Sequence, residues 1–309
     1  MLGTLQMRPI LFALLFALAV LSISIHFNTL ANTDKLENET TRLVIDLTIE
    51  QDVYRDYLRF VKHRNPLSIR NFKNEFARRD VVDAVILQQA IALSGEKYHF
   101  RFSSGFYANR RWVMLQQGLS ALAADTVWHF QAKEMEEQVF ISSPVLDKNE
   151  NFAGLYTTEE KVAHLQRYLP HRVSELKAVV ASDWQPDIVT LHELGLKNIY
   201  MQSSWGAMLS HLFSQQSDIL LAPFPANESL AIRTPKGTLL PLTQFKVQLR
   251  GSRHFVVSKN HPQGERIFNA LQTGLKSMRE QGYLQTVYQQ AGGLNHQTKN
   301  WQVQGKIIL

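Results

Sequence analysis

The sequence contains no cysteine in its 309 residues, which excludes disulfide bonds, thiolate nucleophiles, iron–sulfur clusters and zinc sites built on cysteine. It also lacks a G-x-S-x-G nucleophile elbow, a G-x-x-x-x-G-K-[ST] phosphate loop and a G-x-G-x-x-G dinucleotide turn. The formal net charge is only +6, without a run of five or six basic residues, so little indicates nucleic-acid binding. We therefore expect no enzymatic activity, no cofactor and no metal.

The remaining histidines and clustered carboxylates do not form a recognisable site. His192-Glu193 begins like a helical zinc motif, but Leu196 stands where the second histidine is required. Pro170 separates His164 from His171 and breaks the helical face that they would share. These residues are interpreted as solvated surface groups.

There is one long apolar run, Ile10 to Ile25, which follows Arg8 and precedes Thr29-Leu30-Ala31. This layout is typical of a signal peptide, and the small residues at 29 and 31 predict cleavage after Ala31. The chain is then exported to the periplasm without membrane insertion. An uncleaved membrane anchor is the alternative interpretation, because the run is only slightly shorter than a spanning helix.

The rest of the chain is long enough for about two domains and alternates between β-rich runs and helical patterns. This alternation predicts an α/β architecture with mostly parallel strands. The expected strands are Arg42–Leu47, Tyr98–Phe102, Ala121–Trp128, Lys177–Ala181, Asn198–Gln202, Ile219–Phe224 and His254–Ser258. The expected helices are Asp80–Ser94, Arg110–Gln117, Ile188–Leu194, Trp205–Gln215 and Gln263–Gln281, the last of which Gly282 ends.

Two stretches carry a family pattern. The first runs from Tyr107 to Gly118 (YANRRWVMLQQG), continues into the apolar strand at Ala121 and ends in Ile141-Ser142-Ser143-Pro144. The second, His254–Gly292, places a strand, a lysine, a long helix, a glycine and a short helix in order. Together they resemble the bacterial extracellular solute-binding proteins, close to the family 3 group of transporter substrate-binding domains.

This resemblance implies the two-lobed type II periplasmic binding-protein fold, with the lobes joined by two crossing strands. Lobe one would comprise residues 40–151 plus 253–295, lobe two residues 158–250, and residues 296–309 a C-terminal tail. Phe152–Thr157 would cross outward and His254–Ser258 would cross back. In open α/β sheets ligands lie beyond the carboxyl ends of the strands, so the loops after the strands should line the cleft.

These loops supply the candidate ligand-binding residues Arg110, Trp128, Asp183, Trp184, Ser203, Ser204, Trp205, Phe224 and Glu228. Arg110 matches the family arginine at a helix start, where its charge opposes the helix dipole, so it needs a partner. That partner is either a ligand carboxylate or Asp125. The aromatic residues are equally compatible with core packing, and the serines with helix capping.

The sequence departs from the amino-acid binders of the group. Ala121 stands at the usual acidic position, no arginine follows in Ala132-Lys133-Glu134, and the later aspartate of lobe two falls near Pro223. An ordinary α-amino acid is thus a less favoured ligand than a small polar or anionic solute. We expect a periplasmic solute-binding protein that serves an inner-membrane ABC permease or a sensor. The alternatives are a module that contacts another protein, and a dehydratase-like enzyme with Glu228 as its acid or base.

Overall fold

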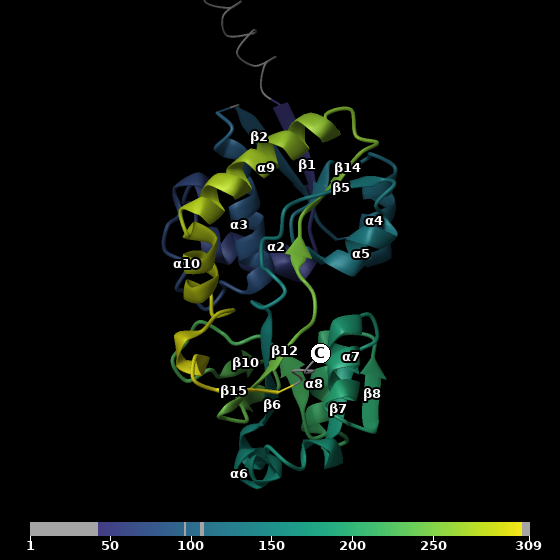
Figure 1. The fold of residues 1–309 in the computed structure, drawn as a ribbon, viewed down its shortest axis with the longest axis vertical. Helices are drawn as coiled ribbons and strands as arrows, with labels where there is room; N and C mark the ends of the chain where they lie inside the picture. The colour runs from purple at the N-terminus through teal and green to yellow at the C-terminus, as the bar shows by residue number, and fades with distance from the viewer. Residues whose placement is uncertain (1–42, 96, 106–107, 305–309) are drawn as a thin grey trace, which may run out of the picture. The chain divides into compact units, whose positions relative to one another are not determined.

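A computed structural model describes residues 43–95, 97–105 and 108–304 (Figure 1). The predicted leader and its cleavage site therefore lie outside the described residues, as does Tyr107. No helix within the described ranges is long and apolar enough to cross a membrane.

The first of the two larger sheets has five strands in the order β2-β1-β3-β14-β5. Its strands are β1 (Leu43–Thr48), β2 (Tyr98–Ser103), β3 (Leu122–Ala123), β5 (Val139–Ile141) and β14 (Val256–Ser258). β1 and β3 are parallel, so their carboxyl ends meet at one edge, whereas β14 runs antiparallel to β3 and β5. Polar segments follow β1 and β3 at that edge.

The helices that accompany this sheet are α2 (Gln51–Val61), α3 (Arg79–Ala92), α4 (Ala108–Gln116), α5 (His129–Glu134), α9 (Gly264–Glu280) and α10 (Tyr283–Gln290), with a 3-10 turn at Pro66–Ser68. Residues 81–91 of α3 are all buried, because α2, α9 and α10 pack against it. Figure 1 shows α9 running beside α3. Gly274 permits this approach, since a Cβ there would lie 1.9 Å from the carbonyl oxygen of Ala90.

The second large sheet is built around β6 (Phe152–Thr158), which pairs antiparallel with three strands. The other members are β9 (Leu220–Ala222), β10 (Ile232–Thr234), β11 (Gly237–Pro241), β12 (Phe245–Gln248) and β15 (Gln302–Gln304). A parallel pair, β7 (Lys177–Ala181) and β8 (Asn198–Gln202), is linked to it by a parallel bridge between Ala178 and Ile219.

Helices α7 (Gln185–Glu193) and α8 (Trp205–Phe213) belong to two different apolar clusters, and α6 (Val162–Leu165) lies beside short 3-10 turns at Glu159–Lys161, Gln166–Tyr168 and Val173–Glu175. Ala178 and Val180 pack with α7, whereas Val179 and Ala181 pack with α8. Because successive side chains of a strand point to opposite faces, α7 and α8 cover opposite faces of β7.

Two further features connect the two sheets along the chain. The strand β13 (Arg253–His254) pairs antiparallel with β4 (Val127–Trp128). After α10 the chain reaches Asn295, whose amide donates to the Pro225 carbonyl at 2.9 Å, forms a 3-10 turn at His296–Thr298 and then adds β15 parallel to β12. The C-terminal segment thus joins the sheet of β6.

Several expected elements differ in the structure. The expected strand Ala121–Trp128 is divided into β3 and β4, because the Thr126 backbone N–H donates to Asp83 and not to a neighbouring strand. His254–Ser258 is likewise divided at Phe255, whose N–H donates to the Ser142 hydroxyl. The prediction of mostly parallel strands is wrong, since β6 pairs antiparallel with β9, β11 and β12.

Candidate ligand-binding site

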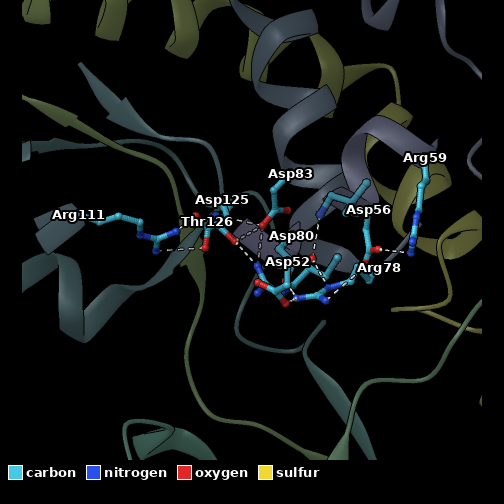
Figure 2. Close-up of polar contacts among 11 residues, drawn as sticks. Asp52, Asp56, Arg59, Arg78, Asp80, Asp83, Arg111, Asp125 and Thr126 are labelled. Atoms are coloured by element: carbon cyan, nitrogen blue, oxygen red, sulfur yellow. Dashed lines mark hydrogen bonds and ion pairs between the residues drawn. The ribbon is translucent and has the colours of Figure 1, made fainter. Parts of the chain in front are cut away.

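Charged residues gather at the edge where β1 and β3 end, as Figure 2 shows. β1 leads through Glu50 into α2, and β3 leads through Ala124 into Asp125 and Thr126. The N-terminus of α3 brings Arg78 and Asp80 to the same place (Figure 2), and Arg79 contacts Thr126 there. Charged side chains that could bind a ligand therefore lie at this edge. The ion pairs among them determine which of these groups are still able to bind a ligand.

Arg78 is engaged by carboxylates of the chain. Its Nε and Nη2 bind the two oxygens of Asp80 at 2.8 and 2.9 Å, and it also reaches Asp52 at 3.0 Å and Asp56 at 3.4 Å. Burial opposes ionisation of Asp80, but Arg78 and Arg79 nevertheless lower the pKa of its carboxyl to about 2. Arg78 thus ties the starts of α2 and α3 together.

Arg111 is a second internally paired cation. Its Nη1 donates to Asp125 at 2.7 Å, and its side chain is only 4% exposed. Glu50 lies 3.8 Å away, and burial raises the pKa of that carboxyl against the opposing charge of Arg111. The ion pair with Asp125, one of the two roles expected of Arg110, is therefore made by its neighbour Arg111.

The fully buried carboxylate of Asp83 organises the innermost part of the edge. One oxygen accepts from Arg79 Nη1 at 2.6 Å and from the backbone N–H and hydroxyl of Thr126 at 3.0 and 2.7 Å. The other accepts from the hydroxyl of Tyr288 on α10. Burial, followed by the charge of Asp83, raises the pKa of Tyr288 well above its ordinary value, so that hydroxyl stays a donor.

Two guanidinium groups meet at Thr126. Its hydroxyl accepts from Arg79 Nη1 at 3.1 Å and from Arg253 Nε at 3.0 Å, and Arg253 Nη2 donates to the Thr126 carbonyl at 2.7 Å. Arg253 is 9% exposed, and burial together with repulsion by Arg79 lowers its pKa to about 9. Within the described residues, Arg253 Nη1 and the Nε and Nη2 of Arg79 have no hydrogen-bond partner.

Asp187 is another buried carboxyl, with a raised pKa. It lies in the first turn of α7 and is 8% exposed. Burial raises its pKa to about 7, and the charges of Arg253 and Arg79 act in the opposite direction. Within the described chain no hydrogen bond or ion pair joins its carboxylate to another side chain.

The predicted residues of the first sheet have different environments. Arg110 is exposed on α4. Trp128 is buried, with the guanidinium of Arg253 4.4 Å from its ring centre. Trp128 therefore contacts one of the two arginines described above.

The predicted residues that follow β7, β8 and β9 are only partly brought together. The half-buried rings of Trp184 and Trp205 are stacked, with their ring centres 6.3 Å apart. Ser204 caps α8 by accepting from the Ala207 N–H, and Phe224 is 2% exposed in the core against Tyr156. The remaining three, Asp183, Ser203 and Glu228, are exposed.

Sequence reasoning missed Arg79, Arg253, Asp83 and Thr126 as a group. A signal existed for the first, since Arg78 and Arg79 stand at a helix start where positive charge is unfavourable. Asp187 is likewise not among the residues predicted from the sequence. Among the described residues, no group of three or more His, Asp or Glu side chains is arranged to hold a metal ion.

Comparison with known proteins places the fold. No protein-family model matches the chain, and no curated protein matches it. A solved structure with a similar fold is the periplasmic VFT2 domain of BvgS from Bordetella pertussis, with 10% identity, coverage of 84% of this chain and 97% of that one, and a TM-score of 0.51.

Two solute-binding proteins are similar to the same extent. One is an amino-acid ABC transporter substrate-binding protein from Streptococcus pneumoniae bound to L-arginine, with 16% identity, coverage of 84% and 96%, and a TM-score of 0.50. The other is YtmK from Bacillus subtilis, a probable amino-acid ABC transporter extracellular-binding protein, with 13% identity, coverage of 68% and 87%, and a TM-score of 0.51. The fold expected from the sequence, α/β and of the two-lobed type II periplasmic binding-protein kind, is confirmed.

Proposed function

We propose that this protein is an extracellular solute-binding protein that captures a small solute bearing an anionic group. The observation that carries the proposal is the convergence of Arg79 and Arg253 on Thr126 with guanidinium nitrogens left over. A guanidinium nitrogen that has no partner in the protein can donate a hydrogen bond to an added anion. Carboxylates fit guanidinium groups well, because two parallel N–H···O bonds can form.

The proposed site adds the predicted residues at the ends of β7 and β8. The stacked, half-buried indoles of Trp184 and Trp205 offer apolar surface for the body of the solute. Exposed Arg110, Asp183, Ser203 and Glu228 remain proposed contacts at the margins. Such a mixture of aromatic surface and few polar groups is typical of small-molecule sites.

A thermal-shift screen of the purified mature protein against small carboxylates tests this function. A solute at a hundredfold excess over its dissociation constant adds about 2.7 kcal/mol of stability if it binds only the native state. Arg79→Lys keeps the positive charge beside Asp83 but removes the planar guanidinium group. The variant should therefore show little of the ligand-induced rise in melting temperature. Arg101→Lys, at an exposed arginine paired with Asp46, is the matched control and should keep it. A shift that survives in Arg79→Lys would contradict the site.

The proposed lobes are residues 40–151 plus 253–295 and residues 158–250, with the hinge near Gly154 and His254. A solute that contacts both lobes favours closure, because only the closed state makes both sets of contacts. Small-angle scattering should therefore give a smaller radius of gyration with saturating solute. Equal radii would oppose a closing motion.

We also propose export by the leader that ends at Ala31 and delivery of solute to an inner-membrane ABC permease or to a sensor, without catalysis. N-terminal sequencing of the exported protein should find Asn32 first. An intact Met1 or Met7 in the membrane fraction would identify the segment as an anchor.

A second candidate function, a module that contacts another protein, is favoured by a different observation. Most charges at this edge, including those of Arg78 and Arg111, are already paired within the chain. A module of this kind would show no thermal shift with any small carboxylate.

A further inference from the structure

The positive charge of the protein is concentrated on one short segment. Residues 55–73, which run from the middle of α2 into the stretch before α3, contain six lysine and arginine residues against a single aspartate. Their excess of five positive charges accounts for most of the formal net charge of +6 of the whole chain. The surface formed by this segment is therefore the most strongly charged candidate for an interaction with an anionic partner.

Four residues of the segment form a stripe along α2. Arg55, Leu58, Arg59 and Lys62 follow one another at the spacing i, i+3, i+4 and i+7, which places them on one side of the helix and at its C-terminal end. All four are exposed, and Leu58 is 53% exposed. The buried residues of α2 lie on other sides of the helix. The stripe is therefore the side of α2 that faces solvent.

Arg64 adds a further cation at the end of α2. Its Nε donates to the Val61 carbonyl at 3.1 Å, its Nη2 donates to the Phe60 carbonyl, and its guanidinium carbon lies 5.2 Å from the Phe60 ring centre. These contacts hold the guanidinium group at the surface, because the residue is exposed. The name basic stripe is used below for Arg55, Leu58, Arg59, Lys62 and Arg64.

The acidic residues of the chain leave most of the basic stripe without a counter-ion. Asp56, the one aspartate of the segment, is shared between Arg59 at 3.5 Å and Arg78 at 3.4 Å. Within the residues that the structure describes, no carboxylate forms an ion pair with the other three cations of the stripe. These charges can therefore bind anionic groups from outside the chain.

The combination of residues in the basic stripe favours a lipid surface as the partner. Arginine binds phosphate through parallel N–H···O bonds, and clusters of basic residues are attracted to anionic lipids. The helix dipole favours basic residues at the end of α2, but it explains neither Arg55 nor an exposed leucine among cations. Apolar residues of interfacial helices enter the boundary between head groups and acyl chains, and Leu58 is placed to do so.

We propose that the basic stripe attaches the protein peripherally to membranes that contain anionic phospholipid, by binding the lipid phosphate groups. The buried residues of α2 stay in the protein core, so the helix lies on the membrane and does not insert into it. The attachment is electrostatic for the most part and is therefore reversible and weakened by salt. No residue of the basic stripe belongs to the proposed solute site, so this inference is independent of the proposed function.

Sedimentation of the full mature protein with lipid vesicles tests the proposal. The wild type should bind vesicles made of equal parts of phosphatidylcholine and phosphatidylglycerol, but not vesicles of phosphatidylcholine alone, and added salt should release it. Arg55→Gln, Arg59→Gln and Lys62→Gln combined should lower the affinity about 100-fold, since each basic residue near an anionic surface contributes about fivefold. Leu58→Gln should lower it about tenfold, because an apolar contact is lost.

A second triple variant is the matched control. Lys197→Gln, Arg233→Gln and Lys236→Gln combined remove the same charge from exposed positions outside the basic stripe, so this variant should bind as the wild type does. Circular dichroism and melting temperatures of all variants show whether each is folded, and exposed substitutions of this kind should change stability little.

Three results would overturn the inference. An equal loss of binding in the two triple variants would mean that only the net charge matters. Absence of wild-type binding to the mixed vesicles at low salt would mean that the basic stripe does not attach to lipid. Wild-type binding to poly-L-glutamate without binding to these vesicles would identify an acidic protein as the partner in place of a membrane.

Discussion

The guanidinium carbon of Arg253 lies 4.4 Å from the ring centre of Trp128, and the same two residues are partners between β13 and β4. An aromatic face attracts a cation placed over it, most strongly when both are shielded from water. The strand pairing fixes the backbone position of Arg253, and the indole of Trp128 fixes the position of its guanidinium group. The position of Arg253 Nη1, the candidate anion-binding nitrogen, is thus determined both by the backbone pairing and by the contact with Trp128.

Thr126→Val should destabilise the protein by about 2–4 kcal/mol. The hydroxyl serves Arg79, Arg253 and Asp83, and its loss leaves buried charged groups short of hydrogen bonds. Urea unfolding measures the free energy. Thr126→Ser keeps the hydroxyl and should cost less than about 1.5 kcal/mol; equal losses in the two variants would show that the methyl group matters and the hydroxyl does not.

Asp187→Asn should stabilise the protein at pH 8 relative to the wild type, but not at pH 4. The folded-state pKa of Asp187 is raised to about 7 from 3.8, so folding favours the protonated form. Its contribution is fully present below the unfolded pKa and is lost as the pH rises through 7. The change amounts to about 4 kcal/mol. Urea unfolding of both proteins at pH 4, 6 and 8 measures it, and a difference that stays constant with pH contradicts the prediction.

Tyr288→Phe should cost about 1.5–3 kcal/mol, because the hydroxyl donates to the buried carboxyl of Asp83, which also pairs with Arg79. Tyr283→Phe is a matched control in the neighbouring turn of the same helix. Its hydroxyl donates to the neutral Gln89 amide oxygen at 2.9 Å, so about 0.5–1.5 kcal/mol is expected. Thermal denaturation of the two variants ranks them, and the reverse order would mean that the bond to Asp83 is weak.

Gly154→Ala should destabilise the protein by about 1–3 kcal/mol. A Cβ there would lie 2.6 Å from the ring of Phe224 and 2.9 Å from that of Tyr156, both buried. Gly206→Ala, in α8, meets nothing within 4 Å and should stabilise by about 0.5–1 kcal/mol. Chemical denaturation measures both changes, and a neutral Gly154→Ala would mean that the rings move aside readily.

Local patterns predicted the strands and helices well where one face is apolar. β7 and β8 have the bounds expected from sequence, because short β-branched runs between polar loops define them. The helix α2 was missed, although Val53, Tyr57 and Phe60 form its buried stripe. The sequence could not distinguish aromatic residues that pack in the core from those that remain accessible to a ligand. Phe224 is in the core, whereas Trp205 is half-buried.

The charged site could not be derived in this way. Thr126 meets Asp83 across 43 residues, and Tyr288 meets it across 205. A short window of sequence does not show such pairs, so Arg110 was considered as the partner of Asp125, although Arg111 makes that ion pair. The fold must first bring β3, α3 and α10 together before a paired charge can be told from one that lacks a partner.

The C-terminal segment has a mechanical consequence. It leaves α10, is fastened by Asn295 to Pro225 and ends as β15 beside β12, in addition to the crossings at β6 and at β12–β13. At its start Gly292 has a φ of 93°, and a Cβ there would lie 2.3 Å from the backbone of Pro225. Rotation of one sheet against the other must therefore twist three tethers rather than two. The torsional stiffness of this third tether sets part of the energy of any such rotation.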